Sequence, residues 1–145
     1  MFFLGHVAAG MALADATKTD RNAAMLGAIF PDLIDKPGNW IFRVMPASRW
    51  LAHGLPFMAL TCGAVAATQP SPRAKGFALG YASHLICDLW AGGRVPWLAP
   101  FVKPKRRPKK RFRLGKLVMY VIPEVVGAAV IGALLSKELV EPREG

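Results

Sequence analysis

The chain has 145 residues, which is enough for one domain with a substantial core. Hydrophobic residues make up 53% of it and only 19% are charged, whereas a soluble domain of this size usually carries more charge. The net charge is nevertheless +10, which favours a membrane protein with an electropositive face or a nucleic-acid-binding protein with an unusually apolar core. The two cysteines, Cys62 and Cys87, exclude a disulfide framework and match no zinc-finger spacing.

Five apolar segments follow one another along the chain, at residues 2–15, 20–35, 49–68, 75–91 and 115–136. They are rich in Ala and Gly and show no alternation of period two, so they favour helices over strands. Asp20 is expected to cap the second helix. We therefore expect a single all-α domain over residues 1–145, a membrane-embedded bundle of about five helices. A membrane span needs about 20 apolar residues, a length that the third and fifth segments reach.

The connections between these segments differ in charge. If the segments alternate in direction, loops 36–49 and 94–116 share one side of the membrane and carry three and ten Lys or Arg residues, against two in 70–75 on the other side. Positive residues stay on the cytoplasmic side, so we expect a multi-pass inner-membrane protein whose long loops face the cytoplasm. The same side carries four tryptophans typical of an interfacial aromatic belt, namely Trp40, Trp50, Trp90 and Trp97.

The basic run KPKRRPKKRFR, residues 103–113, allows three interpretations. It attracts anionic lipid headgroups when it lies beside a membrane helix. It attracts nucleic-acid phosphates equally well. It also serves as a topology signal with no partner at all.

The up-and-down arrangement places all three histidines and three of the nine acidic residues at this same end of the bundle. Ionisable groups near lipid are costly unless they are paired or bound to a metal, and imidazole with carboxylate suits zinc or another divalent metal. Each piece alone has a simpler explanation: a hydrogen-bonded pair at i and i+4, solvated acids at a helix end, or a histidine bonded to a carbonyl. Together they predict a metal site formed by His6, Asp32, Asp35, His53, His84 and Asp88.

Four short motifs, "GHVAAG", "GAIFPDLIDKP", "RWLAHGLPF" and "GYASHLICDLW" followed by "VPWLAPF", occur in order over residues 5–101. They resemble the YdjM-like family of inner-membrane metal-dependent hydrolases. That family is similar to zinc-dependent phospholipase C and the P1-type nucleases, all-helical phosphodiesterases with clustered zinc ions. The resemblance implies one metal held by Asp32, His53, His84 and Asp88. It makes His6 a ligand of a neighbouring metal or a supporting group, and Asp35 a further ligand, a base or the group that orients His53.

The sequence departs from the family pattern around His53. Ser48 stands where the family often has a histidine, and Ala52 and Gly54 replace flanking Thr and Ser. With only three histidines in the chain, we expect one zinc ion, or two at most, rather than a cluster of three.

These residues predict hydrolysis by a metal-activated water, with Asp35 or Asp88 as general base. Arg49 either clamps an anionic group or extends to the membrane interface as a snorkelling residue. A site at the membrane favours a lipid-like phosphoester as substrate, with nucleic acid less favoured. Glu124, beside Pro123, either supports the site or lies near a kink that admits water.

Two other classes of function remain open at this stage. In the first, the chain is a non-catalytic membrane adaptor whose basic loop binds lipid, nucleic acid or a protein, which the loss of a histidine at Ser48 favours. In the second, the polar helix faces line a pathway for a metal or another ion.

Overall fold

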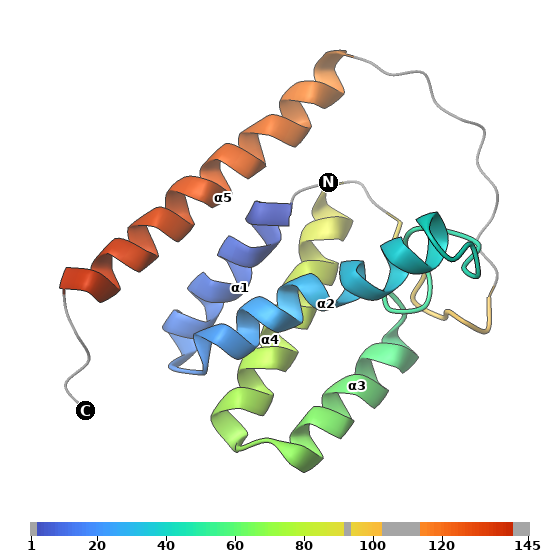
Figure 1. Cartoon of the computed structure of the whole chain (residues 1–145), viewed down its shortest axis with the longest axis horizontal. Coiled ribbons are helices and arrows are strands. Elements are labelled where there is room, and N and C mark those ends of the chain that lie inside the picture. Colours follow the sequence, from blue (N-terminus) through green and yellow to red (C-terminus); the bar gives the residue numbers. More distant parts are fainter. Residues whose placement is uncertain (1–2, 92–93, 103–113, 141–145) are drawn as a thin grey trace.

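The computed structural model describes residues 3–91, 94–102 and 114–140, and over these ranges the chain forms five helices and no strand. The helices are α1 (Phe3–Thr17), α2 (Arg21–Trp40), α3 (Leu55–Thr68), α4 (Ser71–Trp90) and α5 (Leu114–Val140) (Figure 1). The predicted all-helical bundle of about five helices is confirmed.

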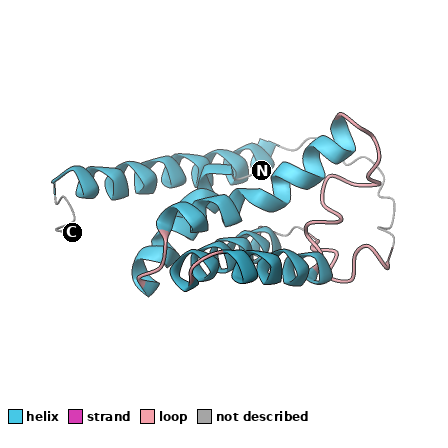
Figure 2. Ribbon diagram, turned by 60° about the horizontal axis from the view of Figure 1, so that its bottom comes forward, coloured by secondary structure: helices cyan, strands magenta, loops and turns pink. Residues whose placement is uncertain are grey.

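Helices α1 and α4 form the centre of the bundle, because each contacts three others: α1 contacts α2, α4 and α5, and α4 contacts α1, α2 and α3 (Figure 1). Helix α5 lies along α1, the one helix that its described residues contact. Figure 2 shows the long connections at residues 41–54 and 94–102 gathered at one end of the molecule. The amide of Leu55 joins them there by a 2.9 Å hydrogen bond to the carbonyl oxygen of Trp97.

Glycines allow α2 and α4 to pack backbone against backbone. A Cβ on Gly80 would lie 1.9 Å from the carbonyl oxygen of Ala24, and a Cβ on Gly27 would lie 2.1 Å from that of Phe77. No side chain fits at such distances, so both positions require glycine. This close contact brings the carbonyl of Ala28, on α2, within reach of His84 on α4.

One predicted helix cap is confirmed, and several helix ends differ from the predicted ones: α4 begins at Ser71 rather than 75, and α5 ends at Val140 rather than 136. The Oδ1 atom of Asp20 accepts a 2.8 Å hydrogen bond from the amide of Ala23, which confirms the predicted cap. Helix α2 runs past the predicted end at residue 35 to Trp40, through Pro37. Helix α3 begins at Leu55, after Gly54, rather than near residue 49, because a proline stands in its first turn. The prediction that His53 lies in this helix is therefore wrong, since His53 precedes it in a loop.

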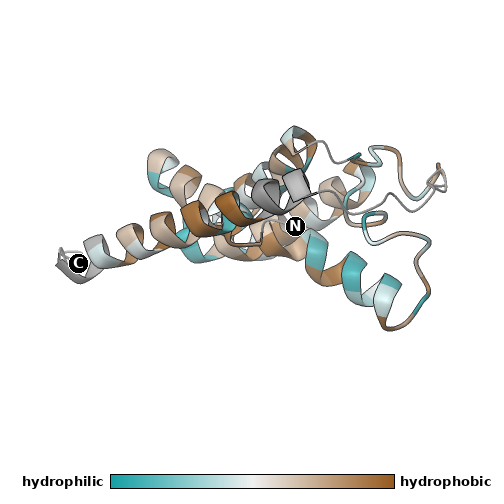
Figure 3. Cartoon of the chain, turned by 90° about the horizontal axis from the view of Figure 1, so that it is seen from above, coloured by the Kyte–Doolittle hydropathy of each residue, from teal (hydrophilic) through white to brown (hydrophobic). Residues whose placement is uncertain are grey.

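The surface of the bundle carries many apolar side chains. Figure 3 shows hydrophobic residues along much of α5, where Ile122, Val125 and Val126 are all more than half exposed. Within the described ranges, none of the helices combines the length and the apolar character that crossing a membrane requires. The multi-pass arrangement and its cytoplasmic orientation stay predictions, and the basic run at 103–113 lies outside the described residues.

Candidate metal centre

The structure brings the six predicted ligand residues into one buried cluster. His6 comes from α1, Asp32 and Asp35 from α2, His53 from the loop before α3, and His84 and Asp88 from α4. Each of the six residues is 7% exposed or less. Burial of this many ionisable groups is costly unless they pair with one another or bind a cation.

Hydrogen bonds fix the orientation of two imidazoles. The Nδ1 atom of His84 lies 2.5 Å from the carbonyl oxygen of Ala28, and a carbonyl only accepts, so Nδ1 carries the proton. The Nδ1 atom of His53 lies 2.7 Å from Oδ2 of Asp35 and donates to it. Both rings thus turn Nε2, the atom available to a metal, toward the interior of the cluster. The two Nε2 atoms are 3.3 Å apart.

Two carboxylates complete this group of donors. Oδ1 of Asp32 lies 3.8 Å from Nε2 of His53 and 4.0 Å from Nε2 of His84. Oδ2 of Asp88 lies 3.4 Å and 3.8 Å from the same two nitrogens. Ligands about 2.0–2.2 Å from a tetrahedral zinc ion are roughly 3.3–3.5 Å apart, so the two imidazole nitrogens and either carboxylate oxygen fit around one ion with small shifts.

The second carboxylate oxygen of Asp88 also indicates a metal site. Its Oδ2 atom is buried and has no hydrogen-bond partner within the described part of the chain. Buried carboxylate oxygens are almost always bonded, so an unbonded one facing two imidazole nitrogens is the arrangement expected of a cation ligand. The residues present therefore fit a divalent metal.

His6 extends the cluster on the α1 side. Its Nε2 atom lies 3.3 Å from Oδ1 of Asp88, and the centroid of its ring lies 4.1 Å from that of the tilted ring of His84. Two sets of three residues have ligand atoms within 4.8 Å of one another: His6, His84 and Asp88, and Asp32, His53 and His84. Because the sets share His84, the cluster could hold one metal ion or two adjacent ones.

Asp35 is engaged by other groups on both of its oxygens. Oδ2 accepts from the amide of Trp50 at 2.6 Å as well as from His53, and Oδ1 accepts from the amide of Ala52 at 3.0 Å. Of the three roles that the family resemblance left open, this geometry favours the one in which Asp35 orients His53. A carboxylate behind a metal-binding histidine fixes its tautomer and makes it a better ligand.

Two cations lie beside the cluster. Nη2 of Arg49 is 2.6 Å from Oδ1 of Asp88, and the Arg49 side chain is 27% exposed. Lys36, which the sequence analysis did not identify, pairs with Oδ2 of Asp32. Its spacing of four residues along α2 was the available signal. Of the two predicted roles of Arg49, binding an anionic group is favoured over extension to the membrane interface, because its guanidinium points at the cluster.

Tyr81 is a second residue that the sequence analysis missed. Its hydroxyl donates a 2.5 Å hydrogen bond to the carbonyl oxygen of Ala52, next to His53, and its side chain is fully buried. It lies one helical turn before His84 on α4, a spacing that places both on one face. Tyr81 thus ties the loop that carries His53 to the helix that carries His84.

The surroundings shift the pKa values of the residues in the cluster in different directions. Burial and the neighbouring imidazoles lower the pKa of His84 to about 4, so it is neutral at pH 7. Burial opposes protonation of His6, but its hydrogen bond with Asp88 prevails and raises its pKa to about 9. Burial would raise the pKa of Asp88, but the nearby imidazoles of His53 and His6 and the charge of Arg49 hold it far below its usual value. A carboxylate with so low a pKa suits a ligand better than a general base.

Glu124 links α5 to the helix that carries His6. Its Oε2 atom accepts a 2.7 Å hydrogen bond from the amide of Leu4, in the first turn of α1. A carboxylate at a helix N-terminus satisfies an amide that has no partner within the helix and interacts favourably with the helix dipole. Of its two predicted roles, support for the site from a distance is the one that this contact favours.

Comparisons with known proteins give one match. Residues 1–143 match the family described as YdjM inner membrane protein, which confirms the resemblance found in the four motifs. No curated protein and no solved structure matches the chain. The hydrolase activity attributed to the resemblance stays a prediction.

Proposed function

Because the chain belongs to the YdjM inner membrane protein family, we propose that it is a membrane-bound, metal-dependent hydrolase acting on a lipid-like phosphoester. One observation carries the proposal: the buried Nε2 atoms of His53 and His84 lie 3.3 Å apart, and each lies 3.4–4.0 Å from a carboxylate oxygen of Asp32 and of Asp88. Imidazole and carboxylate ligands are the types found in zinc sites of hydrolytic enzymes, where three of them hold the ion and a water takes the fourth position.

The residues that would hold the ion are Asp32, His53, His84 and Asp88, with His6 available to a second ion or as a supporting group. When bound there by three of these four residues, or as a five-coordinate ion by all four, a zinc ion would provide a water whose pKa falls to about 7 and a Lewis acid for the phosphoryl oxygen. The carbonyl of Ala28 and the carboxylate of Asp35 keep the two Nε2 atoms directed inward throughout.

Arg49 is the residue that this proposal assigns to the substrate. It is partly exposed while its Nη2 atom contacts Asp88, so its other donors can reach a phosphate oxygen at the edge of the cluster. The basic run at 103–113 adds a general attraction for anionic headgroups. Nucleic acid offers the same phosphate chemistry, but an inner-membrane protein encounters phospholipid continuously, so lipid is the favoured source.

Metal content and hydrolysis, measured on the same purified protein, test the proposal. We expect about one zinc ion per chain in detergent-purified protein and zinc-dependent cleavage of bis(p-nitrophenyl) phosphate. The His84→Ala variant should no longer bind the metal, and the Asp88→Asn variant should no longer catalyse the hydrolysis. Asp15→Asn, which alters an acid of α1 that pairs with Arg21 instead, should change neither.

Other outcomes identify the alternatives. Protein without stoichiometric metal, whose binding to lipid or nucleic acid survives His53→Ala and His84→Ala, would be an adaptor. Metal flux into proteoliposomes without phosphoester cleavage would identify a transporter. Either result overturns the hydrolase.

A further inference from the structure

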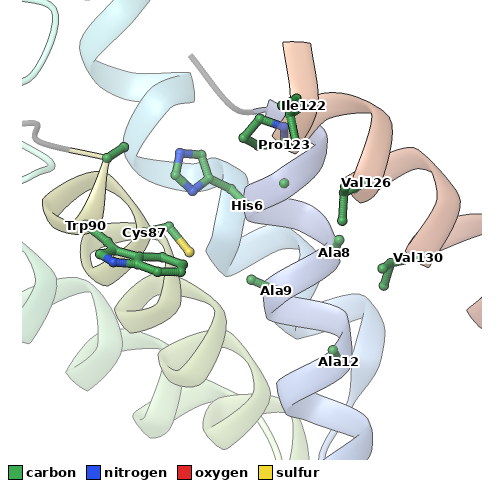
Figure 4. Close-up of a pocket in the computed structure, with 13 residues that line it drawn as sticks. His6, Ala8, Ala9, Ala12, Cys87, Trp90, Ile122, Pro123, Val126 and Val130 are labelled. Carbon is green, nitrogen blue, oxygen red and sulfur yellow. The ribbon is translucent and has the colours of Figure 1, made fainter. Parts of the chain in front are cut away.

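An apolar groove of about 610 Å³ lies between α1, α4 and α5 (Figure 4). Its volume is within the roughly 300–1,000 Å³ typical of small-molecule sites. Figure 4 shows the small side chains of Ala8, Ala9 and Ala12 on α1, with Cys87 and Trp90 of α4 on one side of them and Val126 and Val130 of α5 on the other. The alanines of α1 leave the room that the groove occupies.

The groove and the polar cluster share His6. Among the described residues that line the groove, only His6 has an imidazole or a formally charged side chain, and its Nε2 atom lies 3.3 Å from Asp88. The rest of the lining is almost entirely aliphatic or aromatic. A ligand lying in the groove would therefore have an apolar part along α1 and a polar end at His6 and Asp88.

With the proposed divalent metal bound, the charges at the polar end favour an anion, because the metal, Arg49 and Lys36 outweigh the three carboxylates of the cluster. Arg49 and Lys36 both pair with acids of the cluster, at Asp88 and Asp32. Along the walls of the groove, Val126 is 54% exposed and Trp90 92% exposed, so these walls reach the surface of the molecule. The arrangement matches an amphiphile, with an anionic head at the cluster and a tail that enters from an apolar surrounding.

We propose that this groove binds the alkyl chain of an amphiphilic phosphoester whose phosphate lies at the His6–Asp88 end. The inference rests on the proposed function, because it places the substrate of that hydrolase. Ile122 and Val130, at the two ends of the α5 wall, are eight residues apart, or about 12 Å along a helix. One extended chain of medium length fills that distance.

A direct binding experiment uses the tryptophan in the groove wall. Dodecyl phosphate brominated on its chain should quench the fluorescence of amphipol-stabilised protein, because bromine quenches tryptophan at short range. The saturable part of the quenching should disappear in Trp90→Phe. The Trp90 side chain is exposed, so this substitution should leave the fold intact. Dodecyl phosphate should bind far more tightly than butyl phosphate, since each buried methylene adds about fourfold in affinity.

Two substitutions on α1, one in the groove lining and one outside it, provide a matched comparison. Ala12→Phe should weaken dodecyl phosphate at least tenfold and leave butyl phosphate unchanged, because it fills the space of the tail alone. Ala16→Phe, on the same helix, exposed and outside the groove lining, should behave as wild type. Equal affinity for the two phosphates, or no effect of Ala12→Phe, overturns the inference.

The outcomes also separate this inference from the function on which it rests. Chain-dependent binding without any phosphoester hydrolysis would remove the proposed function and support the groove as an amphiphile site. Asp88-dependent hydrolysis with no chain preference would support the function and overturn the groove. A change of oligomeric state in Ala12→Phe would also overturn it, since the groove would then accept a helix of a second copy.

Discussion

Helix α4 meets α2 and helix α1 meets α5 in two different ways. Between α2 and α4, Gly27 and Gly80 allow the backbones to touch, and the polar groups beyond them are fixed by short hydrogen bonds. Between α1 and α5, the helices touch where Gly127 meets Gly5 and are joined by the bond from Leu4 to Glu124. Beyond that crossing an apolar groove separates them. One interface fixes a site, and the other leaves space for a ligand.

The largest effect should come from adding one methyl group at the α2–α4 contact. Gly80→Ala puts a Cβ 1.9 Å from the carbonyl oxygen of Ala24, so the helices must separate, at a cost of about 1–3 kcal/mol or more. Gly63→Ala is the matched control, because no atom lies within 4 Å of its Cβ; it should stabilise by about 0.5–1 kcal/mol. Chemical unfolding measures both, and changes of the same sign would contradict the prediction.

A second change loosens the fixed interface without breaking it. Asp35→Asn keeps the shape of the side chain, but one of its positions can no longer accept a hydrogen bond, so the orientation of His53 is lost. We expect zinc affinity to fall about 10–100-fold, the usual effect of removing a group behind a metal ligand. Competition with a chromophoric chelator measures it, and unchanged helicity confirms the fold. Wild-type affinity in this variant would remove the orienting role.

The third prediction concerns pH. The pKa of His6 is raised above its ordinary 6.5 to about 9, so its ion pair with Asp88 stabilises the metal-free protein fully below pH 6.5 and is lost as the pH rises through about 9. A metal that takes His6 as ligand must displace that proton, so metal affinity should fall about tenfold per pH unit below pH 9. In the His6→Gln variant, the slope of log metal affinity against pH should be smaller by one proton. An identical slope in the variant would show that His6 is not a ligand.

The smallest effect should appear at the looser interface. Glu124→Gln keeps an acceptor for the amide of Leu4 but removes the charge from the N-terminus of α1, at a cost of about 0.3–1 kcal/mol. Faster hydrogen exchange in the first turn of α1 should report it, while zinc affinity stays at the wild-type value. A large loss of zinc would mean that the two interfaces are coupled.

Sequence patterns were sufficient for the helices and for the meeting of the polar residues. Apolar runs without alternation gave the five elements, and helix direction placed His6, Asp32 and His84 at one end. Those inferences need only the periodicity of the chain and the order of its segments. The start of α3 was also within reach, because Gly54 and the proline after Leu55 mark a helix N-terminus.

The partners of the site residues were beyond sequence patterns. The carbonyl of Ala28 and the amides of Trp50 and Ala52 are backbone groups that every residue carries, so nothing in the sequence marks them as partners of His84 and Asp35. They become specific only when the helices approach at one register. That register depends on where a glycine meets a carbonyl, as at Gly80 and Ala24.

Helix α5 supplies none of the donor atoms of the described cluster, all of which come from residues 6–88. Mutations along residues 126–130 therefore change the shape of the groove without altering the chemistry beside it. In the course of evolution, selection for a different hydrocarbon length could act on this last helix while the histidines and aspartates stayed the same. Variation there and constancy in α1, α2 and α4 is the pattern that such a separation of roles would leave among related chains.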